Sequence, residues 1–240
     1  MRPSLLRLAL GLVVLAGGCA AGPPGFGPPT AGAGPAGTDA RQQQAVALIR
    51  RLRGSVETDA KAPDSPIIGA DLHGVRRSDA LLDALAALPE LRTLNLYGTR
   101  ITDADLDRLR GLSHLQTLNL SATSVTDAGL ARLPAPQGLR VLYLTGTAIT
   151  DAGLPFLRGL PHLQELGLFR TQVTDAGLAQ LRGSKELSRL TLGGKGITDR
   201  GLAYLRELPG LREVDLLGTG VTEAGVRMLQ EARPNLKVLR

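Results

Sequence analysis

The chain has few aromatic residues, one cysteine and three histidines among its 240 residues. Tryptophan is absent and aromatic residues make up only 2% of the chain, so a hydrophobic core must be built mainly from Leu, Ile, Val and Ala. A single cysteine excludes an intramolecular disulfide. The net charge of +6 is spread along the chain without a long block of basic residues, so it gives no indication of nucleic-acid binding.

The single cysteine, Cys19, lies at the end of an N-terminal export signal. Arg2 and Arg7 belong to a short basic segment, residues 8–16 are apolar, and small residues lead up to Cys19. This apolar segment is too short for a stable membrane span. Residues 15–19, Leu-Ala-Gly-Gly-Cys, resemble the lipobox of bacterial lipoproteins, with Ala where that family more often has a second Leu.

The lipobox resemblance implies that residues 1–18 are a lipoprotein signal peptide and that Cys19 is lipidated. Acyl chains on Cys19 would anchor the protein to a membrane of the cell envelope, exposed outside the cytoplasm. The alternative is an ordinary secretory signal peptide with a cysteine close to its cleavage site. Residues 19–40 hold this cysteine and a linker rich in Gly and Pro, which cannot bury enough apolar surface to fold and is predicted to act as a tether.

Six leucines spaced by 24 residues each open the same phrase, which indicates a repeat architecture. They are Leu91, Leu115, Leu139, Leu163, Leu187 and Leu211. The phrase is Leu-x-x-Leu-x-Leu-x-x-Thr-x-[Ile/Val]-Thr-Asp-x-Gly-Leu-x-x-Leu. A degenerate copy begins at Ile67, and a truncated copy at 236–240 closes the chain one residue late. The phrase resembles the leucine-rich-repeat family, with Thr where that family commonly has Asn, and implies about seven repeats plus a terminal strand over 67–240.

The spacing inside each phrase predicts a strand, a turn, a helix and a return. Two leucines lie two residues apart and therefore point to one side of a strand, whereas the later pair, such as Leu154 and Leu157, lies three apart on one helical face. Thr before Asp suits a helix N-cap. Stacked repeats bury the leucines, so we expect an α/β solenoid with a curved parallel sheet on the concave face and helices on the convex face.

Residues 41–66 are predicted to cap the N-terminal end of the solenoid. Ala45, Leu48, Ile49 and Leu52 form one face of a helix, and an additional strand follows within 54–59. At the other end the strand at 236–240 has Lys237 and Arg240, charged side chains of the kind that protect a sheet edge. We expect a monomer, with self-association through this edge as the alternative.

The third, fifth and seventh positions of each phrase are predicted to project from the concave face. Among them are Asn95, Asn119 and Ser121, three of the six aromatic residues (Tyr97, Tyr143 and Phe169) and the charged residues Glu165 and Arg189, and Arg170 follows Phe169 directly. Aromatic residues and Arg commonly anchor protein interfaces. We therefore predict a site for a protein or peptide ligand formed by Tyr97, Tyr143, Glu165, Phe169, Arg170 and Arg189; the alternative is a surface with ordinary strand-forming residues.

Three other rows recur in the repeats and are predicted to be structural. Thr99, Thr123, Thr147, Thr171 and Thr219 are expected to satisfy backbone groups of the turns between neighbouring repeats. The acidic row Asp103, Asp127, Asp151, Asp175, Asp199 and Glu223 is expected to cap helices, with Ca²⁺ binding as the alternative. The row Arg110, Arg158, Arg182 and Arg206 suits helix C-termini, with contact to anionic lipid or cell-wall polymer as the alternative.

The sequence predicts no enzyme, no cofactor and no metal site. It has no Gly-rich phosphate loop, no Gly-x-Ser-x-Gly elbow and no His-Glu-x-x-His motif. His114 and His162 share a repeat position but lie two repeats apart, about 10 Å, which is too far for two ligands of one zinc ion. We therefore expect a non-catalytic protein-interaction scaffold on the bacterial cell envelope. The alternative is an architectural envelope component that binds cell-wall polysaccharide or copies of itself.

Overall fold

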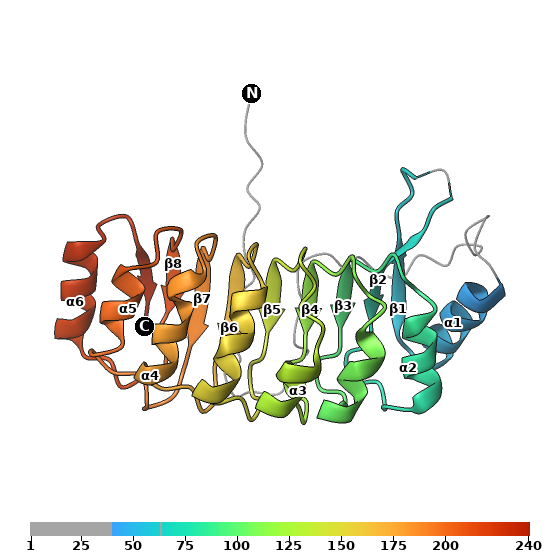
Figure 1. The fold of residues 1–240 in the computed structure, drawn as a ribbon, viewed down its shortest axis with the longest axis horizontal. Helices are drawn as coiled ribbons and strands as arrows, with labels where there is room; N and C mark the ends of the chain where they lie inside the picture. Colours follow the sequence, from blue (N-terminus) through green and yellow to red (C-terminus); the bar gives the residue numbers. More distant parts are fainter. Residues whose placement is uncertain (1–39, 63) are drawn as a thin grey trace.

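The computed structural model describes residues 40–62 and 64–240. The predicted signal peptide, Cys19 and nearly all of the predicted linker lie outside this range. Within it the chain forms a curved solenoid in which each repeat adds one strand and one helical segment (Figure 1). None of the helices in the described range is long and apolar enough to cross a membrane.

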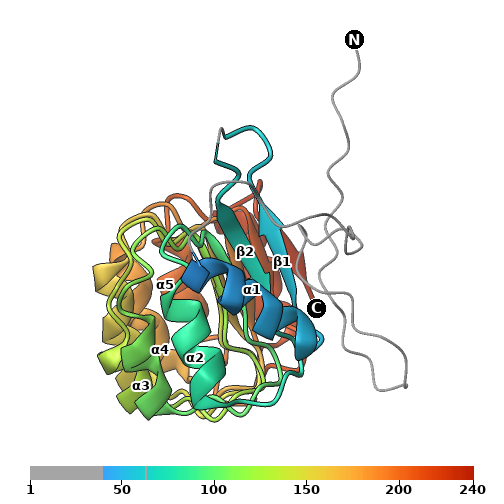
Figure 2. The same ribbon diagram turned by 90° about the vertical axis from the view of Figure 1, so that its right-hand side faces the viewer.

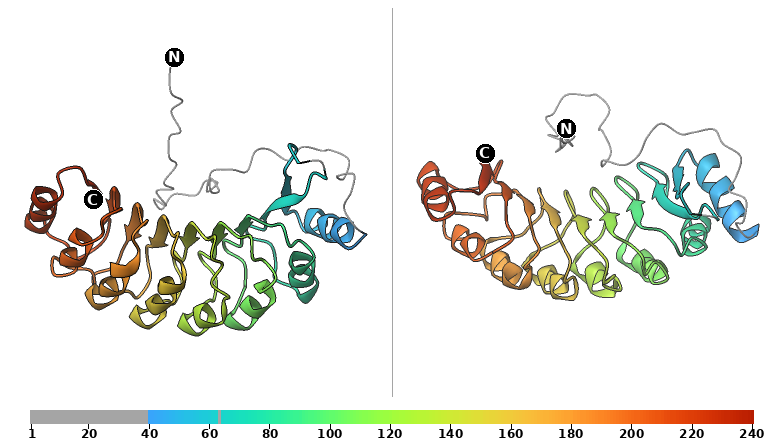
Figure 3. Two further views of the ribbon diagram at one scale, coloured as in Figure 1. Left: turned by 45° about the horizontal axis from the view of Figure 1, so that its top comes forward. Right: turned by 90° about the horizontal axis from the view of Figure 1, so that it is seen from above.

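Nine strands form a single sheet whose spatial order follows the sequence order. The strands are β1 (Ser55–Thr58), β2 (Ile67–Asp71), β3 (Thr93–Asn95), β4 (Thr117–Asn119), β5 (Val141–Tyr143), β6 (Glu165–Leu168), β7 (Arg189–Leu192), β8 (Glu213–Asp215) and β9 (Lys237–Leu239). β1 pairs with β2 in antiparallel orientation, and every later pair is parallel. The sheet lies on the concave side of the arc and the helical segments on the convex side (Figure 3).

The helical segments are short, and three of them are 3-10 helices. They are α1 (Ala40–Arg51), α2 (Asp79–Ala86), η1 (Asp103–Leu109), α3 (Asp127–Arg132), η2 (Asp151–Gly159), α4 (Asp175–Leu178), η3 (Ala179–Gly183), α5 (Leu202–Arg206) and α6 (Glu223–Ala232). A 3-10 helix has three residues per turn, so leucines three apart eclipse one another and both face the core. Leu154 and Leu157 of η2 are buried in this way.

The leucines of successive repeats stack into one continuous core. Leu94, Leu118 and Leu142 pair directly across β3, β4 and β5, and each is fully buried. The 24-residue spacing continues to the last strand, because Lys237 pairs with Glu213. The expectation that the last copy starts one residue late was therefore wrong: Leu236 is aligned with Arg212 and is turned into the core.

The Thr-Asp-x-Gly part of each phrase links neighbouring repeats. Asp103 accepts hydrogen bonds from the backbone N–H (2.7 Å) and the hydroxyl (2.6 Å) of Thr126 in the next repeat. A Cβ on Gly129 would lie 2.2 Å from the Asp103 carboxylate, so only glycine leaves room for this contact. Asp127, Asp151, Asp175 and Asp199 make the same two bonds to the Thr of the following repeat.

One repeat departs from this pattern and replaces the link with an arginine. Asp105 stands where later repeats have glycine, and its own carboxylate accepts the backbone N–H and hydroxyl of Thr102 at 2.9 Å. Asp79, which would occupy the Asp103 role one repeat earlier, bonds instead to Arg77 at 2.9 Å. Arg77 also bonds to Asp105 at 2.7 Å. Burial alone would raise the pKa of Asp105, but the hydrogen bonds from Arg77 and Thr102 lower it.

The two ends of the solenoid differ. At the N-terminal end, α1 buries Ala45, Val46 and Ile49 and packs beside α2, while β1 adds an antiparallel strand to the sheet (Figure 2). At the C-terminal end, the outer edge of β9 pairs with no strand of the described range. Lys237 on this strand forms an ion pair with Glu213 at 3.1 Å.

Candidate functional site

The concave sheet changes character along the solenoid. On β3 and β4 the outward positions are uncharged, and Asn95, Asn119 and Ser121, which directly follows β4, are buried rather than exposed as the alternation predicts. The carbonyl oxygens of the Asn95 and Asn119 side chains accept backbone N–H groups two residues later, which holds these side chains down on the sheet. Apart from Tyr97, the side chains of the predicted site begin at β5 with Tyr143.

Tyr143, Glu165 and Arg189 form one hydrogen-bonded group on β5, β6 and β7. The Tyr143 hydroxyl donates to Glu165 Oε1 at 2.5 Å, and Arg189 Nε donates to Glu165 Oε2 at 2.7 Å. Val141, Glu165 and Arg189 pair in register, and the Tyr143 side chain reaches from β5 to the Glu165 carboxylate on the adjacent strand β6. The Glu165 side chain is only 15% exposed, whereas the Arg189 side chain is 43% exposed, so the carboxylate is shielded from water while the guanidinium still meets solvent. Burial, and then the bond to Glu165, raise the pKa of Tyr143 well above its ordinary value, which keeps the hydroxyl a neutral donor.

The rings of Tyr143 and Phe169 each lie against a glycine of the next repeat. A Cβ on Gly167 would be 2.9 Å from Tyr143 Cδ1, and a Cβ on Gly193 would be 2.4 Å from Phe169 Cδ2. Both glycines are buried, and both rings are half-buried. The glycines therefore allow the two half-buried rings to lie close against the sheet.

Arg170 follows Phe169 at a turn that favours glycine. Its φ is 55°, in the left-handed region, and the same turn position holds Gly146 (φ 68°) one repeat earlier. The Arg170 guanidinium lies 5.5 Å from the centre of the Phe169 ring, a distance that suits a cation–π contact. The exposed charge of Arg170 is thus held over the Phe169 ring.

The sixth predicted residue, Tyr97, lies apart from the other five. It follows β3, two strands away from Tyr143, and its ring meets His73 edge-on with 5.0 Å between ring centres. His73 was not predicted as a partner, although it precedes Tyr97 by one 24-residue period. The structure therefore brings together Tyr143, Glu165 and Arg189, and pairs Phe169 with Arg170.

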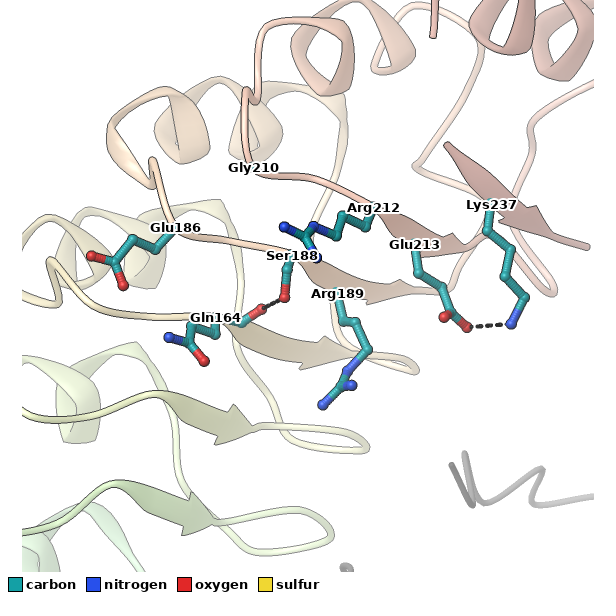
Figure 4. Close-up of a pocket in the computed structure, with 8 residues that line it drawn as sticks. All are labelled: Gln164, Glu186, Ser188, Arg189, Gly210, Arg212, Glu213 and Lys237. Carbon is teal, nitrogen blue, oxygen red and sulfur yellow. Dashed lines mark hydrogen bonds and ion pairs between the residues drawn. The ribbon is translucent and has the colours of Figure 1, made fainter. Parts of the chain in front are cut away.

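A shallow polar hollow adjoins this group where the last strands begin (Figure 4). It has a volume of about 570 Å³. Its lining residues are Gln164, Glu186, Ser188, Arg189, Gly210, Arg212, Glu213 and Lys237. Arg189 is the only one of them in the predicted site. Sequence reasoning missed the hollow because it depends on the small residues Ser188 and Gly210, whose positions carry Gln164 and Glu186 one repeat earlier.

Most members of the three recurring rows form bonds within the solenoid. The five recurring threonines each donate a hydroxyl hydrogen bond to the backbone carbonyl three residues earlier, as Thr123 does to Leu120 at 2.6 Å. These bonds lie within one repeat and do not join neighbouring repeats as expected. Arg110 bonds to Asp107, Arg158 to Gln180 and Arg182 to Glu207. Within 40–62 and 64–240, no three His, Cys, Asp or Glu side chains are grouped so that they could hold a metal ion.

Comparisons with known proteins agree with this architecture. Residues 89–132 match a family model described as leucine-rich repeats in two copies. Internalin C2 of Listeria monocytogenes shares 23% sequence identity, with 86% of this chain and 96% of that chain covered and a TM-score of 0.55. A second internalin of that species, inlF, shares 20% identity, with 86% of this chain and 71% of that chain covered and a TM-score of 0.49. A search of curated proteins gave no match. The chain has the fold of a leucine-rich-repeat solenoid like that of internalin C2.

Proposed function

We propose that this chain is a non-catalytic scaffold that binds a protein or peptide ligand on the C-terminal half of its concave face. The observation that carries the proposal is the pair of rings, Tyr143 and Phe169, spread over Gly167 and Gly193 beside the Glu165–Arg189 ion pair. Aromatic rings fixed by packing lose little conformational entropy when a ligand covers them. Tyr, Phe and Arg are also residue types enriched at interface cores.

The chemistry of this group favours binding over catalysis. Tyr143 remains a neutral hydrogen-bond donor because its pKa is raised, so it is a poor general base. Glu165 accepts bonds from both Tyr143 and Arg189, which leaves it satisfied in the ligand-free surface. Such an arrangement presents a rigid, partly apolar surface with fixed polar groups, the form expected for a recognition site.

The test is capture of ligand from a bacterial envelope extract by the immobilised full chain. The variant Tyr143→Ala, Phe169→Ala removes both concave rings, and we expect it to lose at least about tenfold in captured ligand, as loss of interface anchors predicts. The matched control is Phe156→Ala, Tyr204→Ala, which removes one Phe and one Tyr from η2 and α5 on the convex side. Both variants are compared at equal folded concentration, measured by circular dichroism.

Each outcome of this capture experiment assigns a different surface. A ligand lost only by the concave variant supports the proposal. Equal capture by both variants would move the site to the convex rows or to the edge of β9 and overturn it. Binding of cell-wall material with no captured protein would favour the architectural alternative.

We also propose that a lipid on Cys19 holds the scaffold at the cell envelope, with the Gly- and Pro-rich segment as a spacer. The support is the lipobox-like Leu-Ala-Gly-Gly-Cys at 15–19 and the absence of any other cysteine in the chain. Acylation would add about 0.8 kcal/mol of membrane affinity per buried CH₂. Cys19→Ala is expected to move the chain from the membrane fraction to the soluble fraction in cells of its own host. A chain that stays in the membrane fraction after this change would disprove the anchor.

A further inference from the structure

The hollow beside the concave group owes its shape to two small residues. Ser188 lies before β7 and its hydroxyl donates to the Gln164 backbone carbonyl at 3.0 Å, so it stays low against the sheet. Gly210 packs tightly: a Cβ there would lie 2.5 Å from the Lys185 carbonyl oxygen. Neither residue projects a side chain into the space, which leaves it open to solvent and to a ligand on the concave side.

Four of the five charged residues that line the hollow already have side-chain partners. Glu186 accepts a hydrogen bond from His162 at 2.9 Å and another from Gln164, and these bonds lower its pKa. Glu213 pairs with Lys237 at 3.1 Å. Arg189 reaches out of the hollow to Glu165. The two carboxylates of the hollow are therefore committed to other partners.

Arg212 is the exception. Its backbone is fixed in the sheet, because its N–H donates to Ser188 O at 2.9 Å and its carbonyl accepts from the Lys237 N–H at 2.9 Å. Its exposed guanidinium forms no hydrogen bond or ion pair with any residue that the structure describes. In Figure 4, dashed lines join Ser188 to Gln164 and Glu213 to Lys237, and none reaches Arg212. The N–H donors of the Arg212 guanidinium therefore have no partner in the described part of the chain, although two glutamates line the same hollow.

We propose that Arg212 binds a carboxylate of the protein ligand, supplied by an Asp or Glu side chain or by the ligand's C-terminus. The inference rests on the proposed function, because it names the group that a ligand of the concave face would place in this hollow. A guanidinium and a carboxylate match in shape and form two parallel hydrogen bonds. Among the three cationic residues that line the hollow, Arg212 is the one without a carboxylate partner in the described part of the chain, so it has room for one added carboxylate. Glu186 and Glu213 lie close enough to disfavour a dianion such as phosphate through like-charge repulsion.

The hollow is continuous with the aromatic group through one residue. Arg189 lines the hollow and also holds Glu165, which in turn accepts the Tyr143 hydroxyl. A ligand that covers the Tyr143 ring can therefore reach Arg212 by crossing from β5 to the start of β8. The shared Arg189 makes the rings and the hollow parts of one recognition surface.

The test uses simple probes and the full chain, so that it does not depend on finding the natural ligand. An acetylated, amidated alanine peptide with one glutamate supplies a side-chain carboxylate. An acetylated alanine peptide with a free C-terminus supplies a terminal carboxylate, and the amidated alanine peptide supplies neither. Inorganic phosphate supplies the dianion. Binding is followed by NMR through the Nε–H resonances of the arginine side chains at constant ionic strength, with Arg212→Gln as the variant and Arg227→Gln, an exposed arginine on α6, as the control.

We expect at least one carboxylate peptide to bind about tenfold more tightly than the uncharged peptide, as one hydrogen-bonded ion pair predicts. Arg212→Gln should remove this advantage and Arg227→Gln should keep it. Whichever carboxylate peptide binds identifies the source. The inference is overturned by no preference for either carboxylate, by an equal preference in Arg212→Gln, or by tighter binding of phosphate. Because these probes are independent of the envelope capture, failure of either experiment leaves the other informative.

Discussion

At the scale of single residues, Arg170 occupies a backbone conformation that suits glycine. Its φ of 55° is in the left-handed region, as are those of Gly98, Gly146, Gly194 and Gly218 at the same turn position; Ala122, with φ 54°, is the other non-glycine residue at this position. A side chain in this region costs about 1–2 kcal/mol relative to the right-handed region. The cost at Arg170 coincides with a guanidinium held over Phe169, and strained backbone residues cluster at ligand-binding sites. This coincidence supports a role for Arg170 in binding.

Replacing Arg170 by glycine should therefore stabilise the fold and weaken the site. We expect Arg170→Gly to raise the free energy of unfolding by about 0.5–1 kcal/mol, because relief of the left-handed strain exceeds the added freedom of glycine in the unfolded chain. The measurement is urea unfolding together with envelope capture. Arg170→Ala is the control: it keeps the strain and removes the charge, so it should lose capture without gaining stability. A lower unfolding free energy for Arg170→Gly would contradict the strain argument.

At the scale of elements, the threonine that precedes the helical region is bonded to the repeat before it in five successive repeats. Thr174, the N-cap of α4, accepts from the Ala176 N–H at 3.3 Å and donates to Asp151 at 2.6 Å. Gly177 lets the Asp151 carboxylate approach, since a Cβ there would be 2.2 Å from Asp151 Oδ1. Three residues of one short motif thus fix the spacing between two repeats.

The close approach of Gly177 to Asp151 predicts that one added methyl group lowers the stability of the fold. Gly177→Ala should lower the free energy of unfolding by about 1–3 kcal/mol, because the new methyl group displaces the Asp151 carboxylate from Thr174. Gly183→Ala, at a glycine with open space around its Cβ position, should change it by less than about 0.5 kcal/mol. Urea unfolding of both variants is the measurement. The double variant Gly177→Ala, Asp151→Ala should cost less than the sum of the two single changes, because both act on the same contact. A fully additive cost would show that the new methyl group clashes elsewhere.

At the scale of the whole molecule, one apolar core runs from Ala45 in α1 to Leu236 before β9. Each repeat contacts its two neighbours, so an internal repeat is supported on both sides and the last strand on one side only. Val214 in β8 is fully buried, whereas Val238, its core-facing partner in β9, is half-buried. The stability of the solenoid therefore depends on position along its axis as well as on residue type.

A matched pair of truncations measures this dependence. Val214→Ala should lower the free energy of unfolding by about 1.5–3 kcal/mol, the usual cost of losing a fully buried valine side chain. Val238→Ala, the same change at the core-facing position of the terminal strand, should cost markedly less because this side chain already meets solvent. Equal costs in urea unfolding would indicate that the outer side of β9 is covered in solution, for example by a second copy of the chain.

The fold was predictable because one phrase recurs many times along the chain, whereas the candidate site was predictable only in part. Six copies of one phrase predicted the strands, the parallel sheet and the convex helices, and the structure confirms them. The burial of Asn95 and Asn119 was missed because it depends on side-chain bonds to the backbone two residues later. Tyr97 was grouped with Tyr143 because they share a face, but they lie two strands apart.

The sequence by itself determined the solenoid, because leucines spaced by 24 residues can be buried only by stacking one repeat on the next. It also determined which residues reach the concave face, since the period of a strand is two. Only the tertiary structure decided how those residues pair. Glu165 joins Tyr143 to Arg189, and Arg212 remains free beside two glutamates. These pairings depend on the direction of each side chain and on the size of its neighbours one repeat away, and the spacing of residues along the chain contains neither.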